Sequence, residues 1–170
     1  MPSPVDSLPR IAAGLGRAGL IPFCAAPALI YLDPARSGLY SQLIASYTLA
    51  IICFLVGAWW GIALIRRGRL ALLLSNGVVI VAFLAHALLS TPAFLLCCAA
   101  LFPATVLVER RAGIFRAQPA YYARLRLHLT VVAVATLLLT FMLLLHPGLA
   151  QVSPPLPALS TPWEEAASTS

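Results

Sequence analysis

The chain has very little charge and no lysine. Only 9% of its 170 residues are charged, against about 25% in an average soluble domain. Its eleven basic residues are all arginine, and it has five acids. This is too little charge to cover the surface of a water-soluble domain of this size. The 61% of hydrophobic residues also exclude intrinsic disorder, so the composition predicts an integral membrane protein.

Groups that carry catalytic chemistry are scarce as well. Asp33 and Glu109 stand at the ends of apolar segments, and no acid lies deep inside one. Proton-coupled transport normally needs an intramembrane carboxylate, and hydrolysis usually needs an acid–base pair. The cysteines lack metal-ligand spacing and read as small hydrophobic residues. The sequence therefore predicts no enzyme activity, no metal site and no cofactor.

Five long apolar segments are present instead. Their continuous apolar character is typical of helices that cross the membrane and differs from the alternation of barrel strands. We expect an all-α bundle of five transmembrane helices at residues 15–32, 41–65, 70–90, 92–108 and 125–145. A segment at 1–14 precedes the membrane domain of residues 15–146, and a Pro/Ser/Thr-rich tail follows at 147–170. Pro22 and Pro27 predict a kink in the first helix. That segment could instead be a signal peptide, but no convincing small-residue cleavage site follows it.

The arginines indicate the orientation. Ten of the eleven fall at one end of the predicted helices, and only Arg36 falls at the other. The positive-inside rule then predicts a cytoplasmic N-terminus and a C-terminus outside. Aromatic and basic residues near the inner end are expected to anchor the helices at the membrane interface. These anchors are Trp59, Trp60, Arg66, Arg67, Tyr121, Tyr122, Arg124 and Arg126.

A stripe of small residues runs along the second segment. At helical spacing of three or four it contains Ser46, Ala50, Cys53, Gly57 and Gly61. The last two form a GxxxG pair, which lets two helix backbones come close in lipid. The stripe predicts either packing inside this bundle or a face that binds another chain.

Three polar residues are expected inside the membrane: Ser75, Asn76 and His86. Such groups usually face the interior of a bundle and serve structure or function. His86 and His128 differ in predicted depth, so they do not form a pair of haem ligands. The sequence leaves open whether His86 and Asn76 are structural or functional.

Several ordered motifs resemble one uncharacterised family. They are Gly19 to Phe23, Ser46-Tyr47, Phe54 to Leu64, and Tyr121 to Thr130. Together they are similar to the bacterial domain-of-unknown-function family that includes eukaryotic transmembrane protein 69. The resemblance implies a five-helix multi-pass protein and supplies no activity. It also implies a polar residue at the Trp59 position and a proline after the Ser75 position, and this chain departs from both.

The function expected from these observations is non-enzymatic. We expect an accessory, scaffold or assembly component of a larger membrane complex, respiratory or photosynthetic, in a bacterial inner membrane. A mitochondrial inner membrane is the less favoured location. Its partners would be the lipid bilayer and other membrane subunits, and not nucleic acid. A small carrier or channel is the alternative, based on the kinked helices and on His86 with Asn76. A lipid-modifying enzyme has only the interfacial arginines in its favour.

Overall fold

The computed structural model describes residues 4–66, 69–111 and 120–146. Residues 1–3, 67–68, 112–119 and the predicted tail at 147–170 lie outside the described part. The described residues form helices and no strand. They are α1 (Pro4–Ala18), α2 (Ile21–Leu32), the short 3-10 helix η1 (Pro34–Arg36), α3 (Ser37–Arg66), α4 (Arg69–Leu88), α5 (Thr91–Arg111) and α6 (Ala120–Leu145).

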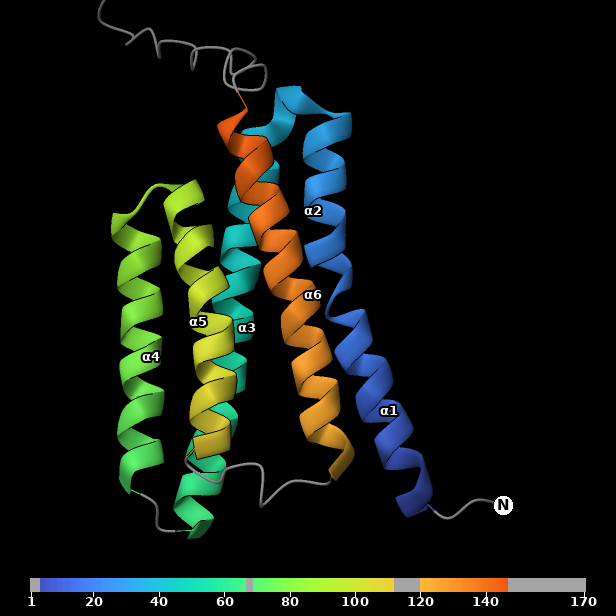
Figure 1. Ribbon diagram of the computed structural model, residues 1–170, viewed down its shortest axis with the longest axis vertical. Helices are drawn as coiled ribbons and strands as arrows, with labels where there is room; N and C mark the ends of the chain where they lie inside the picture. Colours follow the sequence, from blue (N-terminus) through green and yellow to red (C-terminus); the bar gives the residue numbers. More distant parts are fainter. Residues whose placement is uncertain (1–3, 67–68, 112–119, 147–170) are drawn as a thin grey trace, which may run out of the picture.

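Within the described part of the chain, five stretches are long and apolar enough to cross a membrane, which confirms the predicted all-α class and the predicted number of spans. They are Arg10–Leu32, Pro34–Ile65, Arg69–Leu88, Thr91–Arg111 and Tyr121–Leu145. Successive spans run in opposite directions, so the start of α1 and the end of α6 lie at opposite ends of the bundle (Figure 1). The helices make this a multi-pass membrane protein. Which end faces the cytoplasm stays a prediction.

The first span consists of two helices, and its break lies at Gly19 and Leu20. Pro22 has no N–H to donate to the carbonyl of Ala18, so one continuous helix cannot pass this point with all its hydrogen bonds. Near the start of α2 the same proline is tolerated, because the first N–H groups of a helix have no partner within the helix. Pro27 lies within α2. The kink predicted in this segment is therefore a break before Pro22.

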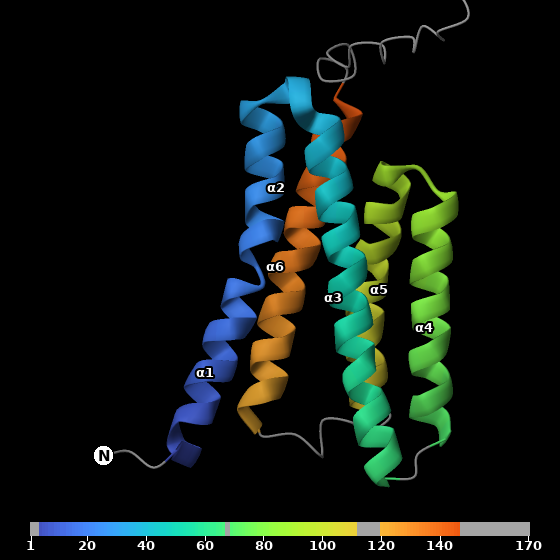
Figure 2. The same cartoon turned by 180° about the vertical axis from the view of Figure 1, so that it is seen from behind.

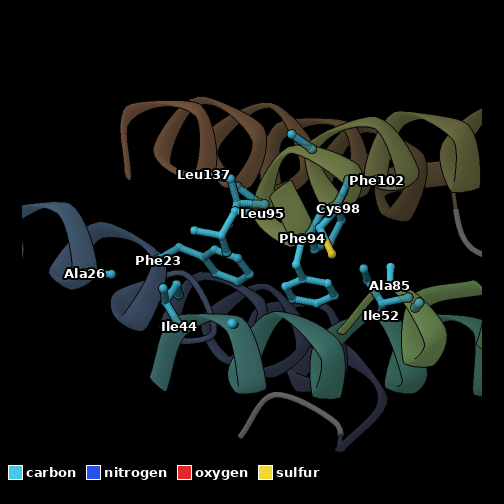
Figure 3. Close-up of a cluster of buried hydrophobic side chains, with 14 residues drawn as sticks. Phe23, Ala26, Ile44, Ile52, Ala85, Phe94, Leu95, Cys98, Phe102 and Leu137 are labelled. Atoms are coloured by element: carbon cyan, nitrogen blue, oxygen red, sulfur yellow. The ribbon is translucent and has the colours of Figure 1, made fainter. Parts of the chain in front are cut away.

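The hydrophobic core joins all the spans around α5. Figure 3 shows Phe94, Leu95, Cys98 and Phe102 of α5 between side chains of α2, α3, α4 and α6. Small residues of α4, such as Ala85, leave room for the rings of α5. The membrane-spanning part of α5 is 39% buried, whereas that of α4 is only 11% buried. The central position of α5 fixes where its polar residues can meet those of α3 and α6.

Candidate functional site

Five polar side chains gather inside the bundle near the end where α3 and α5 finish and α6 begins. Trp59 comes from α3, Thr105 and Glu109 from α5, and Arg126 and Thr130 from α6. Each of these residues is at most 4% exposed. We call this group the Glu109–Arg126 cluster.

Helical periodicity brings these residues together. Thr105 and Glu109 are four residues apart on α5, and Arg126 and Thr130 are four apart on α6, so each pair shares one helix face. Because α5 and α6 pack closely side by side, the two faces meet. Arg126 lies about 9 Å along α6 from its first residue, at 1.5 Å per residue. The cluster is therefore inside the bundle and not at its rim.

The guanidinium of Arg126 is the centre of the cluster. Its Nε lies 3.3 Å from Oε2 of Glu109 and donates to Oε1 at 3.4 Å. Its Nη2 donates to the Thr105 hydroxyl at 2.8 Å, and its Nη1 donates to the Thr130 hydroxyl at 2.9 Å. Thr105 in turn donates to the backbone carbonyl of Phe102 at 2.7 Å. The charged side chain of Arg126 is thus surrounded by acceptors from two helices.

Glu109 also connects the cluster to a third helix, α3. The indole Nε1 of Trp59 donates to its Oε1 at 2.9 Å. Oε2 has no hydrogen-bond partner within the described part of the chain, and its contact there is the ion pair with Arg126. Tyr122 is half-buried and lies one turn before Arg126 on α6. It interacts electrostatically with both Glu109 and Arg126.

The cluster is a buried ion pair whose charges and hydrogen bonds are satisfied mainly within the protein. A lone charge away from water is strongly unfavourable, and a buried pair with hydrogen bonds offsets that cost. Here the charges neutralise each other, and nearly all their hydrogen-bonding atoms are used within the protein. The arrangement fixes α3, α5 and α6 relative to one another.

Two of the predicted interface anchors are buried inside the bundle. Trp59 is 1% exposed and Arg126 is 3% exposed, so neither side chain faces the outside of the bundle. Arg126 is turned towards α5, where Glu109 compensates its charge, and Trp59 finds its hydrogen-bond acceptor on the same carboxylate. Glu109 lies near the end of α5, as its place in the sequence indicates, and its side chain is also fully enclosed.

A second contact holds the break in the first span. The hydroxyl of Tyr47 on α3 donates to the backbone carbonyl of Gly19 at 2.9 Å. Phe23 packs edge-on against Tyr47, with ring centroids 5.5 Å apart, and edge-on against Phe102 at 5.9 Å. The start of α2 is thereby attached to α3 and α5.

The motifs noted in the sequence are therefore close in space. Gly19 and Phe23 meet Tyr47 at the break, while Trp59, Arg126 and Thr130 meet in the cluster. A family model described as a protein of unknown function (DUF3429) matches residues 8–142. The chain belongs to this family. The resemblance to an uncharacterised domain family is thus confirmed. No curated protein and no solved structure gives a significant match.

The DUF3429 match covers every member of the cluster, including three that were not among the predicted site residues: Thr105, Glu109 and Thr130. A signal for them existed. Glu109 and Arg126 are opposite charges at the same predicted end of adjacent spans, and each has a threonine four residues deeper in its helix. At the Trp59 position, the indole N–H makes the polar contact in this member of the family.

The remaining predicted anchors differ in placement. Trp60 is 44% exposed and Tyr121 is 37% exposed, and Arg124 is also exposed on the outside of the bundle. Their contact with the membrane interface stays a prediction. The side chain of Arg66 and the whole of Arg67 lie outside the described part of the chain.

The small-residue stripe on α3 does not pack inside this bundle at its glycines. A Cβ added at Gly57 or Gly61 would meet no atom within 4 Å. Ser46 and Ala50 are also exposed, and Cys53 is half-buried. Of the two interpretations that the sequence left open, the packing interpretation is wrong for the GxxxG pair, because this face of α3 points away from the other helices.

The three intramembrane polar residues are not brought together. Ser75 is buried, and its hydroxyl donates to the carbonyl of Leu72 on its own helix at 2.8 Å. Asn76 is exposed and its amide donates to the same carbonyl at 2.9 Å, so its expected position facing the bundle is wrong. His86 is about 15 Å further along α4, given ten residues at 1.5 Å each. It packs edge-on against Phe94, with ring centroids 4.9 Å apart.

Proposed function

We propose that this DUF3429 protein is a non-enzymatic membrane protein that serves as an accessory, scaffold or assembly component of a larger membrane complex. The observation that carries the proposal is the open face of α3 around Gly57 and Gly61. Both glycines leave the helix backbone accessible from outside the bundle. Small residues at such a face allow a second helix to approach closely, which is a main source of helix association in lipid.

The shape of this face suits a helix from another chain. Its small residues lie between large exposed side chains, namely Phe54 at 75%, Trp60 at 44% and Leu64 at 61% exposure. A partner helix can pack against the backbone at the glycines while these larger groups contact its sides. The bundle does not need the face for its own assembly, since the core and the Glu109–Arg126 cluster hold α3 from its other side.

The proposed location is a bacterial inner membrane, with the N-terminus in the cytoplasm and the C-terminus outside. The arginine asymmetry supports this orientation, with ten arginines at one end and Arg36 at the other. A respiratory or photosynthetic complex is the proposed host, and a mitochondrial inner membrane is the less favoured setting.

One of the two observations that favoured a small carrier or channel, the combination of His86 with Asn76, does not agree with the structure. The two residues lie at different depths and Asn76 points out of the bundle. The buried charges of Glu109 and Arg126 form an ion pair with each other. They therefore offer no free charge for transport. The accessory role is therefore the better-supported proposal.

The experiment compares Gly57→Leu and Gly61→Leu with Gly77→Leu. Gly77 is an exposed glycine of α4 whose added Cβ would also meet no atom within 4 Å, so it is a matched control. The full chain is affinity-purified in mild detergent, and co-purifying membrane subunits are identified by mass spectrometry. We expect the wild type and Gly77→Leu to retain the same subunits, and both α3 variants to lose them with an unchanged unfolding temperature.

Two results would contradict the proposal. One is a wild-type chain that purifies alone under conditions that preserve membrane complexes. The other is equal retention of partner subunits by all three leucine variants, which would mean that the α3 face contacts only lipid.

A further inference from the structure

A cavity of about 320 Å³ lies between α3, α4 and α5, at the opposite end of the bundle from the Glu109–Arg126 cluster. Its lining consists of Gln42, Ala45, Ser46, His86, Leu89, Thr91 and Phe94. At this end α4 and α5 stop short of α2, α3 and α6, which leaves a step in the bundle (Figures 1 and 2). The cavity lies at this step, where α3 rises beside the turn between α4 and α5.

Four polar side chains converge on this cavity: Gln42, Ser46, His86 and Thr91. Within the described part of the chain, none of them makes a side-chain hydrogen bond to another residue. Other hydroxyls of the spans behave differently. Those of Ser41, Thr48 and Ser75, for example, donate to carbonyls of their own helices.

Unpaired polar groups in an apolar environment are costly, so their gathering at one place needs an explanation. An amide, two hydroxyls and an imidazole each supply at least one hydrogen-bond donor. Among the described residues that line the cavity there is no acid and no arginine. Thr91 is also the first residue of α5, and the free N–H groups at a helix start add partial positive charge. The lining therefore favours a ligand with several acceptor oxygens.

The size and surroundings of the cavity indicate the rest of the ligand. About 320 Å³ is at the lower end of the range for small-molecule sites, enough for a head group but not for a whole lipid. Gln42, Ser46 and Leu89 are exposed, so the cavity opens on the outer surface of the bundle. Apolar side chains such as Leu88 and Leu43 are exposed nearby on α4 and α3.

We propose that this cavity binds the oxygen-bearing head group of a membrane lipid, with the lipid tail lying along the exposed apolar surface of the bundle. Acceptor oxygens of a phosphate, an ester or a quinone ring would receive hydrogen bonds from Gln42, Ser46, Thr91 and His86. Phe94, packed edge-on against the imidazole, limits the movement of His86 and keeps it at the cavity wall. This inference is independent of the proposed accessory role.

The experiment uses the full-length chain in dodecyl maltoside micelles with ¹⁵N-labelled histidine side chains. The chain has three histidines, and the signal of His86 is assigned with His86→Gln. One titration uses short-chain phosphatidylglycerol and the other uses decyl-ubiquinone. We expect one of the two to shift the His86 signal saturably, while those of His128 and His146 stay in place. The probe that does so identifies a phosphate-bearing or a quinone head group.

The variants Ser46→Ala and Gln42→Leu each remove hydrogen-bonding groups from the lining without touching the histidine probe. Together they should raise the apparent Kd about thirtyfold, the effect of losing two ordinary hydrogen bonds. Asn76→Leu, a polar-to-apolar change on the outside of α4, is the control and should leave the Kd unchanged. Thermal unfolding checks that each variant is folded, and Ser46→Ala alone provides the test if the double variant is not.

Three outcomes would overturn the proposal. The first is no shift of His86 with either probe. The second is an equal shift of all three histidine signals, which would indicate partitioning into the micelle. The third is an unchanged Kd in a folded lining variant.

Discussion

The indole of Trp59 and the carboxylate of Glu109 are hydrogen-bonded at 2.9 Å although they are 50 residues apart in the chain. The bond joins α3 to the pair formed by α5 and α6, and the ion pair between Glu109 and Arg126 completes the connection. In lipid there is no hydrophobic drive between helices comparable to that in water, so packing and polar contacts of this kind decide which helices associate.

Removing one member of the ion pair should destabilise the bundle strongly. Arg126→Leu leaves the carboxylate of Glu109 buried without its counter-charge, and Glu109→Leu does the same to the guanidinium. Breaking a buried pair in this way typically costs about 3–5 kcal/mol. The double variant removes both charges and should recover much of that loss. Denaturant unfolding of the four proteins in detergent forms a double-mutant cycle that measures the coupling.

Arg124→Leu is the control for this cycle, because Arg124 is exposed on the same helix. Its effect should stay within about 0.5 kcal/mol. Additive losses in the double variant, with no recovery, would contradict a stabilising ion pair between Glu109 and Arg126.

The hydrogen bond of Trp59 should be measurable by itself. Trp59→Phe keeps an aromatic ring but removes the N–H that Glu109 accepts. A hydrogen bond to a charged group contributes about 1.5–3 kcal/mol, and the smaller ring adds a packing loss. Trp60→Phe, at an exposed neighbouring position, should cost far less in the same unfolding assay. Equal losses in the two variants would exclude a special role for Trp59.

The contact of Tyr47 with Gly19 should hold the break between α1 and α2. Tyr47→Phe removes the donor while keeping the ring that packs on Phe23. We expect a loss of about 0.5–1.5 kcal/mol and faster hydrogen exchange of the backbone amides at residues 19–21 and 23. Tyr31→Phe, at a residue that is 72% exposed, should leave the exchange unchanged. Unaltered exchange in Tyr47→Phe would mean that Pro22 alone determines the break.

The predicted orientation can be tested with reporter fusions at Gly68, Gly113 and Ser160, which lie outside the described residues. With five spans and the arginine-rich end inside, Gly68 and Gly113 should report the cytoplasm and Ser160 the outer side. A cytoplasmic reporter at Ser160 would contradict an odd number of spans. An external reporter at Gly68 would reverse the orientation.

The all-α class and the number of spans could be predicted from the residues alone. Apolar runs long enough to cross a bilayer leave no other solution than helices, because every backbone N–H and C=O must find its partner within the segment. The start of α5 at Thr91 and Pro92 also obeys a local rule, since a proline in the first turn of a helix loses no hydrogen bond. The number of spans therefore follows from local rules. The predicted starts of the first two spans do not agree with the structure, since these spans begin at Arg10 and Pro34 and not at residues 15 and 41.

The inward-pointing face of each helix depends on how the helices pack against one another in three dimensions. Trp59 and Arg126 are residue types typical of interface anchors, and so are their neighbours Trp60 and Arg124. The burial of Trp59 and Arg126 depends on the rotation of α3, α5 and α6, which brings Glu109 within reach of both. The same rotation turns Gly57, Gly61 and Asn76 outwards. In lipid, apolar side chains are accepted on every face, so hydrophobicity alone cannot specify this rotation, and the pairing of a few polar groups does.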